Sequence, residues 1–302
     1  MFGLNKIISP NTNYLFMDYR KNFIILSTIT IIISILLLSF KGLNLGIDFK
    51  GGTLIEVKIN DSDIAELRSI LSPHFNDLSL QEFGDSETII VRLQNESNIE
   101  SIETVNKVKS LISDKVKEFR RSEFVGPTIS SELLWRGLQA ISFALIAILI
   151  YIWLRFEWQF GFGAVVALAH DVIFTLGILS LFDVDFSLSS IAAILTIAGY
   201  SINDSVVIFD RIRENLRKYK KLDLPDLFNL SINNTLSRTI ITSLTTLIAL
   251  LSLYLLGGEV IKPFAFAMII GVVVGTYSSI FIAVPTLLIF KFRPQEEDNK
   301  LI

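Results

Sequence analysis

The sequence has 302 residues, of which 51% are hydrophobic, and carries a net charge of −3 at pH 7. Its mean hydropathy of +0.55 is too high for an ordinary soluble domain and indicates a membrane protein with several spans. The lack of cysteine excludes disulfides, thiol catalysis and Cys-ligated metal sites, and two His residues are too few for a His-rich metal site. The sequence has no Walker A, Rossmann or hydrolase nucleophile motif, so we expect neither an enzyme nor a cofactor.

Six apolar stretches are long enough to cross a bilayer, which takes roughly 20 helical residues. They cover 23–40, 138–154, 161–182, 188–209, 239–256 and 264–290. The first stretch is longer than the apolar part of a signal peptide, and no small-x-small cleavage site follows it. We therefore expect it to be a retained membrane anchor.

Basic residues are concentrated in alternate connections between these stretches. The connections 183–186 and 257–263, on the other side, are poor in them. The positive-inside rule therefore predicts cytoplasmic termini, comprising an N-terminal segment 1–22 and a tail 291–302. The basic residues are Lys6, Arg20, Lys21, Arg155, Arg211, Arg213, Arg217, Lys218, Lys220, Lys221, Arg238, Lys291 and Arg293.

A polar segment, 41–132, follows the first span and is expected to be extracytoplasmic. Its pattern predicts strands at 52–59, 77–84, 86–94 and 122–127 and helices at 61–71 and 98–119. The order β-α-β-β-α-β is that of a ferredoxin-like domain. The remaining spans form a five-helix bundle, 133–290, so that the fold class is six transmembrane helices in a 1+5 arrangement with a small α/β extracytoplasmic domain.

The predicted cytoplasmic loop 210–237 mixes basic and acidic residues. We interpret it as a solvated amphipathic helix that its charge holds on the inner side of the lipid bilayer. An anionic-lipid or nucleic-acid role has no aromatic interleaving or motif to support it, so we expect no nucleic-acid partner.

Asp204 is the main candidate for function. It lies seven residues before Arg211 and hence about 10 Å deeper along the helix. Carboxylates inside membranes usually face a bundle interior or water and belong to ion pathways or proton relays. The alternative is that Asp204 only hydrogen-bonds a neighbouring helix, but Asn or Thr would do so at lower cost.

Arg238 begins the fifth span and is the candidate partner of Asp204. Thr239, Thr242 and Thr246 follow at helical spacing and predict a polar face that reaches into the membrane. If this face meets Asp204, the two charges pair when the acid is deprotonated and part when it is protonated. The alternative for Arg238 is snorkelling to the membrane interface.

Asp171 lies midway along the third span. Its neighbour His170 offers a group with which to share a proton, although adjacent helical residues do not face each other. The sequence does not decide between a second relay station and a hydrogen bond that serves packing.

The sixth span carries packing signals. Gly271, Gly275 and Ser279 form a stripe of small residues for close helix approach. Pro285 is expected to kink the helix near its end.

Long motifs are spread over nearly the whole chain. They are LNLGIDFKGGTLIEV (43–57), FVGPTISSEL (124–133), YIWLRFEWQFGFGAVVALAHDV (151–172), GYSINDSVVIFDRIRENLR (199–217) and LSRTIITSLTT (236–246). Together they resemble the SecF family of protein-export membrane subunits. The fourth motif favours this family over its sister SecD, whose equivalent stretch typically reads VDANVLIFERI.

The resemblance implies half of an RND-type transporter in the bacterial inner membrane. SecD would supply the other half, and the pair would use the proton-motive force to draw a translocating preprotein out of the SecYEG channel. Asp204 would be the proton-responsive acid and Arg238 its basic partner, with Asp171 less clearly assigned. Gly51 and Gly52 would belong to the membrane-proximal start of the external domain.

Two other functions would use some of the same sequence features. An RND-like exporter of small molecules or lipids would carry two large external loops, whereas this chain has one modest loop. A purely structural assembly subunit would use the same charges for assembly only, and the sequence does not separate this reading from proton coupling.

Overall fold

The computed structural model describes residues 12–60, 63–75, 78–83, 85–93 and 98–290. The predicted tail 291–302, with Lys291 and Arg293, and the N-terminal residues up to 11, with Lys6, lie outside these residues. The chain divides into two units, which we describe separately. The bundle unit comprises Met1–Leu43, Ile141–Val184 and Ala192–Ile302, and the sheet unit comprises Asn44–Ala140 and Asp185–Ile191.

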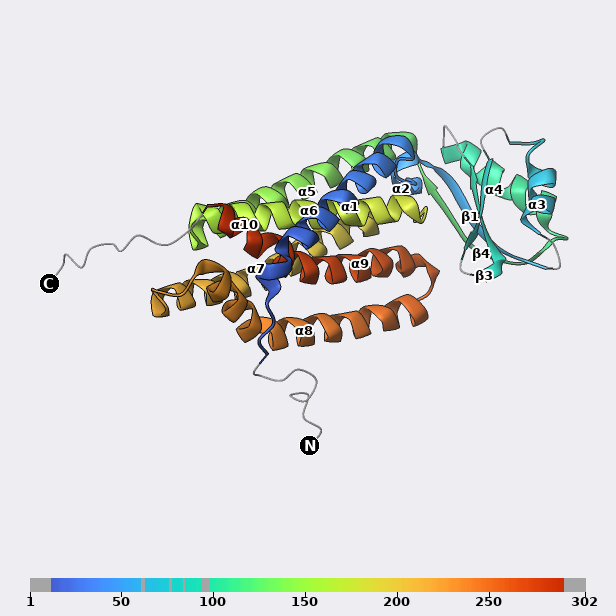
Figure 1. Ribbon diagram of the computed structural model, residues 1–302. Coiled ribbons are helices and arrows are strands. Elements are labelled where there is room, and N and C mark those ends of the chain that lie inside the picture. Colours follow the sequence, from blue (N-terminus) through green and yellow to red (C-terminus); the bar gives the residue numbers. More distant parts are fainter. Residues whose placement is uncertain (1–11, 61–62, 76–77, 84, 94–97, 291–302) are drawn as a thin grey trace. The chain divides into compact units, whose positions relative to one another are not determined.

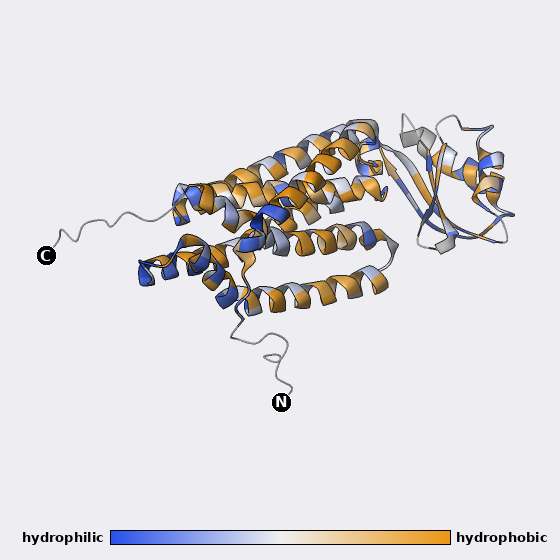
Figure 2. Cartoon of the chain, in the orientation of Figure 1, coloured by the Kyte–Doolittle hydropathy of each residue, from blue (hydrophilic) through white to orange (hydrophobic). Residues whose placement is uncertain are grey.

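Within the described residues, six helical stretches are long and apolar enough to cross a membrane, which confirms the predicted number. Many of their large apolar side chains are exposed, as expected for helices that face lipid. Figure 2 shows hydrophobic residues along these helices. The helices are α1 (Arg20–Phe40), α5 (Pro127–Arg155), α6 (Trp158–Leu181), α7 (Leu188–Lys218), α8 (Leu224–Leu256) and α9 (Lys262–Ser278), which runs on into the sixth span's last segments.

The sixth span is interrupted near its end. A π-helical segment, η4 (Ser279–Ala283), separates α9 from α10 (Val284–Ile289), and Pro285 lies in the first turn of α10. Proline has no backbone N–H to donate to the preceding turn, so a local break in the α-helical pattern is expected beside it.

Most of the stretch 210–237 is helical, because α7 and α8 both continue beyond the apolar spans and leave only a short turn between them. It is not simply a solvated helix. Ile212, Leu216, Phe228 and Ile232 are buried in the core of the bundle unit. Charged residues cover the rest, and Figure 2 shows hydrophilic residues gathered where α7 turns into α8.

The segment before α1 packs against this extension of α8. Asn233 accepts a hydrogen bond from the Tyr14 backbone N–H (3.0 Å) and donates one to the Tyr14 carbonyl (2.9 Å). Asn229 accepts from the Met17 N–H (2.9 Å), and the Met17 side chain is fully buried. The beginning of the described chain is therefore tied to α8.

The sheet unit contains four antiparallel strands in the order β2-β3-β1-β4. Alternate apolar residues on one face, among them Ile55, Val57, Ile89 and Val91, pack with the helices to form a separate core. The elements run in the predicted order β-α-β-β-α-β: β1 (Gly52–Ile59), α3 (Ile64–Leu71), β2 (Leu78–Phe83), β3 (Asp85–Leu93), α4 (Asn98–Ile112) and β4 (Val116–Val125).

The predicted helix 98–119 is wrong at its C-terminal end. The helix ends at Ile112, and β4 begins at Val116 instead of residue 122. Val116 pairs with Ile59, and Phe119 pairs with Val57. Residues 116–119 are compatible with helical spacing, but pairing with β1 decides the outcome, since it satisfies their backbone groups along the sheet.

Gly51 and Gly52 link a short helix, α2 (Ile47–Lys50), to β1. Both have positive φ values, 75° and 111°, which residues with a side chain rarely adopt. Gly52 is already paired with Val125 of β4. The two glycines therefore turn the chain into the central strand, a conformational role.

Asp185 ties the connection between α6 and α7 into the sheet unit. It forms an ion pair with Arg92 of β3 and accepts a hydrogen bond from Asn44 (2.8 Å). Only 14% of the Arg92 side chain and 17% of the Asp185 side chain are exposed. Loss of one partner would therefore leave a largely buried charge without compensation.

We expect Asp185→Ala to destabilise the sheet unit by about 3 kcal/mol, the low end for breaking a buried ion pair. The double variant Arg92→Leu/Asp185→Leu removes both charges and should recover much of that loss. Hydrogen exchange of the β3 amides in the whole protein measures the effect. Equal protection losses in the single and double variants would contradict this account of the pair.

Candidate functional site

Asp204 is buried inside the bundle unit. Its side chain is on α7, and only 3% of the residue is exposed. The carboxylate atom Oδ2 has no hydrogen-bond partner among the described residues. A buried polar atom without a partner costs free energy, so its retention suggests a role other than packing.

Contacts between α7 and α8 fix the level at which Asp204 lies. The Tyr200 hydroxyl donates to Ser243 Oγ at 3.3 Å. Consecutive helices joined by a short turn run in opposite directions. The turn of α7 that follows Tyr200 and the turn of α8 that precedes Ser243 therefore lie at the same depth in the bundle. These turns carry Asp204 and Thr239.

A buried hydroxyl of α8 at the same depth also lacks a hydrogen-bond partner among the described residues. Thr239 is 1% exposed, and its Oγ1 has no hydrogen-bond partner in the described part of the chain. Arg238, the preceding residue, is exposed, and its charge acts on the Asp204 carboxylate. Within the described residues, Asp204 and Arg238 do not form a direct ion pair, so the two charges are near each other but not locked together.

Thr242, another of the predicted threonines, does not join this site. Thr242 is exposed and bonds to carbonyls of its own helix, those of Arg238 and Thr239. The buried polar face of α8 instead continues from Thr239 to Ser243, which is 2.7 Å from Thr276 of α9.

Asp171 has a different environment. It is fully buried on α6, and both carboxylate oxygens are engaged. Ser201 of α7 donates to Oδ2 at 2.6 Å, and Ser278 of α9 donates to the same atom at 2.7 Å. His170 Nδ1 lies 3.0 Å from Oδ1. Asp171 thus connects three helices, and we call Asp171, His170, Ser201 and Ser278 the Asp171 clamp.

The contact between His170 and Asp171 corrects the expectation that adjacent helical residues do not meet. The His170 ring reaches back to its neighbour and lies between the rings of Phe174, which stacks on it, and Tyr277. Its Nε2 is buried and has no partner among the described residues. Tyr277 in turn donates to the Phe23 carbonyl of α1 (2.9 Å).

Glycines allow α9 to approach α7 closely at the clamp. A Cβ atom on Gly275 would lie 3.2 Å from Ser201 Cβ and 3.6 Å from Asp171 Oδ2. One on Gly271 would overlap with the Ile197 side chain. The predicted stripe of small residues is therefore in contact with α7, the helix that carries Asp204.

The structure therefore brings three of the predicted site residues into one region. Ser201, which binds Asp171, precedes Asp204 by about one helical turn, and Arg238 approaches from α8. Gly51 and Gly52 belong to the sheet unit. Sequence reasoning missed Ser201 and Ser278, although Ser201 stands three residues before Asp204 and Ser278 three after Gly275, spacings that share a helix face.

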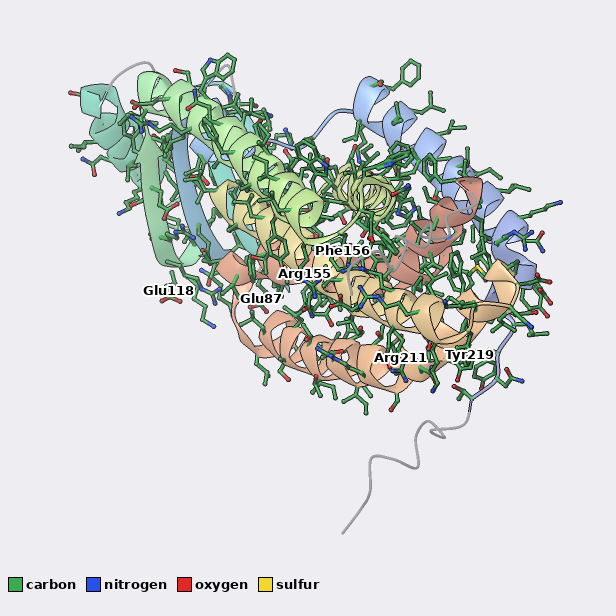
Figure 3. All side chains as sticks on the ribbon, turned by 90° about the vertical axis from the view of Figure 1, so that its left-hand side faces the viewer. Glu87, Glu118, Arg155, Phe156, Arg211 and Tyr219 are labelled. Carbon is green, nitrogen blue, oxygen red and sulfur yellow. The ribbon has the colours of Figure 1, made fainter. Side chains whose placement is uncertain are left out.

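Ion pairs lie near the C-terminal ends of α5 and α7. Arg155 pairs with Asp210 at 3.0 Å, and Arg213 pairs with Glu157 at 3.5 Å. Figure 3 labels Arg155 and Phe156 here, Arg211 on α7 and Tyr219 just after the end of α7. Within the described ranges, no three His, Asp or Glu side chains converge as metal ligands.

Comparison with protein families finds two matches. Residues 104–293 match the family "Protein export membrane protein SecD/SecF, C-terminal". Residues 36–62, which include Gly51 and Gly52, match the "SecD/SecF GG Motif".

Similar proteins cover the same length. The chain is 43% identical over 293 residues to "Protein translocase subunit SecF" of Rickettsia rickettsii (strain Sheila Smith), with 95% of each chain covered. It is 44% identical over 297 residues to the protein of that name in Rickettsia bellii (strain OSU 85-389), covering 97% of this chain and 98% of the other.

Solved structures also resemble the chain. The crystal structure of SecDF, a translocon-associated membrane protein from Thermus thermophilus, matches with a TM-score of 0.87 and 36% identity over 94% of this chain. SecDF in its super-membrane-facing form matches with a TM-score of 0.68 and 35% identity over 93%. In both comparisons, this chain spans 39% of the SecDF chain.

Proposed function

The chain belongs to the SecD/SecF family of protein-export membrane proteins, and on that premise we propose that it is a SecF subunit that uses the proton-motive force to promote export. It would do so together with SecD at the SecYEG translocon, acting on the emerging preprotein. The match to 39% of the SecDF chain supports SecD as the partner, because the name SecDF combines the two.

The proposed arrangement is half of an RND-type transporter in the bacterial inner membrane. One span precedes the sheet unit and five follow it, which supports the 1+5 arrangement. The strand order β2-β3-β1-β4 with two helices on one face supports a ferredoxin-like domain. The basic residues where α7 turns into α8 support cytoplasmic termini, by the positive-inside rule.

Asp204 is the proposed proton-binding residue. The observation that carries this assignment is its buried carboxylate, whose Oδ2 has no hydrogen-bond partner among the described residues although Arg238 is near. A deprotonated Asp204 would attract Arg238 and α8, and a protonated one would release them. Proton binding would thereby change the relation between α7 and α8.

The energy available from one proton sets what such a site can do. Moving one charge through a potential of 100 mV is worth about 2.3 kcal/mol, or roughly a fiftyfold change in a two-state population. That suffices to bias a conformational change of the external domain. It is far less than the free energy of unfolding of a typical domain, about 5–15 kcal/mol.

The test is reconstitution of the chain with SecD and SecYEG, followed by measurement of gradient-dependent release of a secreted protein. We expect Asp204→Asn to abolish the gradient dependence while the complex still assembles. Asp210→Asn is the matched control, because Asp210 is on the same helix but exposed, and its pair with Arg155 should contribute little.

Two outcomes would reject the proposal. If Asp204→Asn responds to the gradient like the wild type, Asp204 serves packing only. If it mainly prevents recovery of the SecD complex, the chain's charges act in assembly, and the structural-subunit interpretation holds.

A further inference from the structure

We infer that Asp171 is a positioning residue that holds α7 in the rotation needed by Asp204, and that it does not itself exchange protons during the cycle. This inference rests on the proposed function, since it assigns Asp204 the proton. It resolves the alternative that the sequence left open for Asp171.

Three groups that can donate hydrogen bonds surround the Asp171 carboxylate. Two serine hydroxyls and the His170 ring surround its carboxylate at 2.6, 2.7 and 3.0 Å. A carboxylate only accepts hydrogen bonds, so all three contacts are satisfied when Asp171 is ionised. A proton on Asp171 would have to be donated to one of these three groups, which would then have to change from donor to acceptor.

Asp204 differs from Asp171 in the hydrogen bonding of its carboxylate. Both acids are buried, at 0% and 3% exposure. Asp204 Oδ2 has no partner among the described residues, so a proton can bind there without displacing a donor. Full satisfaction favours a fixed charge, and an unoccupied acceptor favours exchange.

The groups around the Asp171 clamp also bear on whether Asp171 carries a proton. An ionised Asp171 fixes the proton of His170 on Nδ1, which leaves Nε2 as the ring atom without a partner. An unpartnered acceptor costs less than the buried, unpartnered N–H that a charged imidazole would present there. Tyr277 is a further titratable group, which contacts the His170 ring and bonds to α1, and Asp204 stands three residues after Ser201 on α7.

Ser201 on α7 links the Asp171 clamp to Asp204. Each residue turns an α-helix by about 100°, so Ser201 and Asp204 lie on neighbouring parts of one face. The bond from Ser201 to Asp171 therefore limits rotation of α7 about its axis. Gly275 permits this bond, because a Cβ atom there would press on Ser201 Cβ at 3.2 Å.

The experiment is pH-difference infrared spectroscopy of the reconstituted complex with SecD, which detects the C=O stretch of a protonated carboxyl group. We expect one such band to disappear in Asp204→Asn and to persist in Asp171→Asn. In Ser201→Ala and Gly275→Ala, the band should persist with its pH midpoint shifted by about one unit, a tenfold change in proton affinity. Gly199→Ala is the control, because nothing lies within 4 Å of a Cβ atom there.

The outcomes separate this inference from the proposed function. Loss of a carboxyl band in Asp171→Asn would overturn the inference, and so would unshifted midpoints in Ser201→Ala and Gly275→Ala. If no band depends on Asp204, the proposed function fails instead. Should Asp171→Asn not fold, Ser201→Ala and Ser278→Ala each keep two of the three donors and still report on the clamp.

Discussion

Replacing Gly177 by leucine is expected to force α1 away from α6 and to destabilise the bundle unit by about 3 kcal/mol. A Cβ atom on Gly177 would overlap with the Ser34 side chain and lie 2.8 Å from the Ser34 Cα. Ser34 is buried, and its backbone cannot move without moving α1 as a whole. Helix association in a bilayer depends in part on van der Waals packing, which small residues improve by letting backbones approach closely, so the substitution acts on the packing itself.

Thermal unfolding of the detergent-solubilised protein, followed by circular dichroism, measures this effect. Gly199→Leu is the matched control on α7, since that position is exposed and open. An unchanged unfolding midpoint for Gly177→Leu would show that α1 is not packed against α6 as described.

Arg238→Gln is expected to remove gradient-dependent release to the same extent as Asp204→Asn. Without the guanidinium, the ionised Asp204 has no compensating charge nearby, and the attraction between α7 and α8 is lost. Because the two residues act as one unit, the double variant should be no worse than either single variant. Arg238→Lys keeps the charge but not the planar fork, and should retain part of the response.

Arg217→Gln is the control for this prediction, because it removes an exposed positive charge from the end of α7. The measurement is release of a secreted protein with and without the gradient. Additive losses in the double variant would mean that Asp204 and Arg238 contribute independently. The snorkelling interpretation of Arg238 would then be preferred.

The sequence was a good guide to elements with long, periodic signals. The six apolar stretches and the strands 52–59 and 86–94 need only hydrophobic length or alternation to be recognised. It failed at residues 116–119, whose side chains fit either period, because the deciding interaction is with β1, far away in the chain. It also gave no indication that 210–237 buries one face, since charges on the opposite face dominate the composition.

The candidate site was predicted only in part. Acids within apolar stretches are visible in a sequence because their cost in a membrane is high. Ser201 and Ser278 are small, common residues, and their importance follows only from the helix packing that brings them to Asp171. Whether an acid is satisfied or unsatisfied is a property of its neighbours, so sequence reasoning left the role of Asp171 undecided.

The way in which α8 binds the segment before α1 has a consequence for sequence tolerance. Asn229 and Asn233 contact main-chain atoms of Tyr14 and Met17, which every amino acid other than proline offers in full. The two asparagine side chains on α8 therefore bind this segment through its main chain, and their binding depends little on which side chains it carries at most positions. Met17, whose side chain is buried, and Phe16, whose ring contacts Phe281, are constrained in size, so the other positions of this segment can diverge while it remains bound.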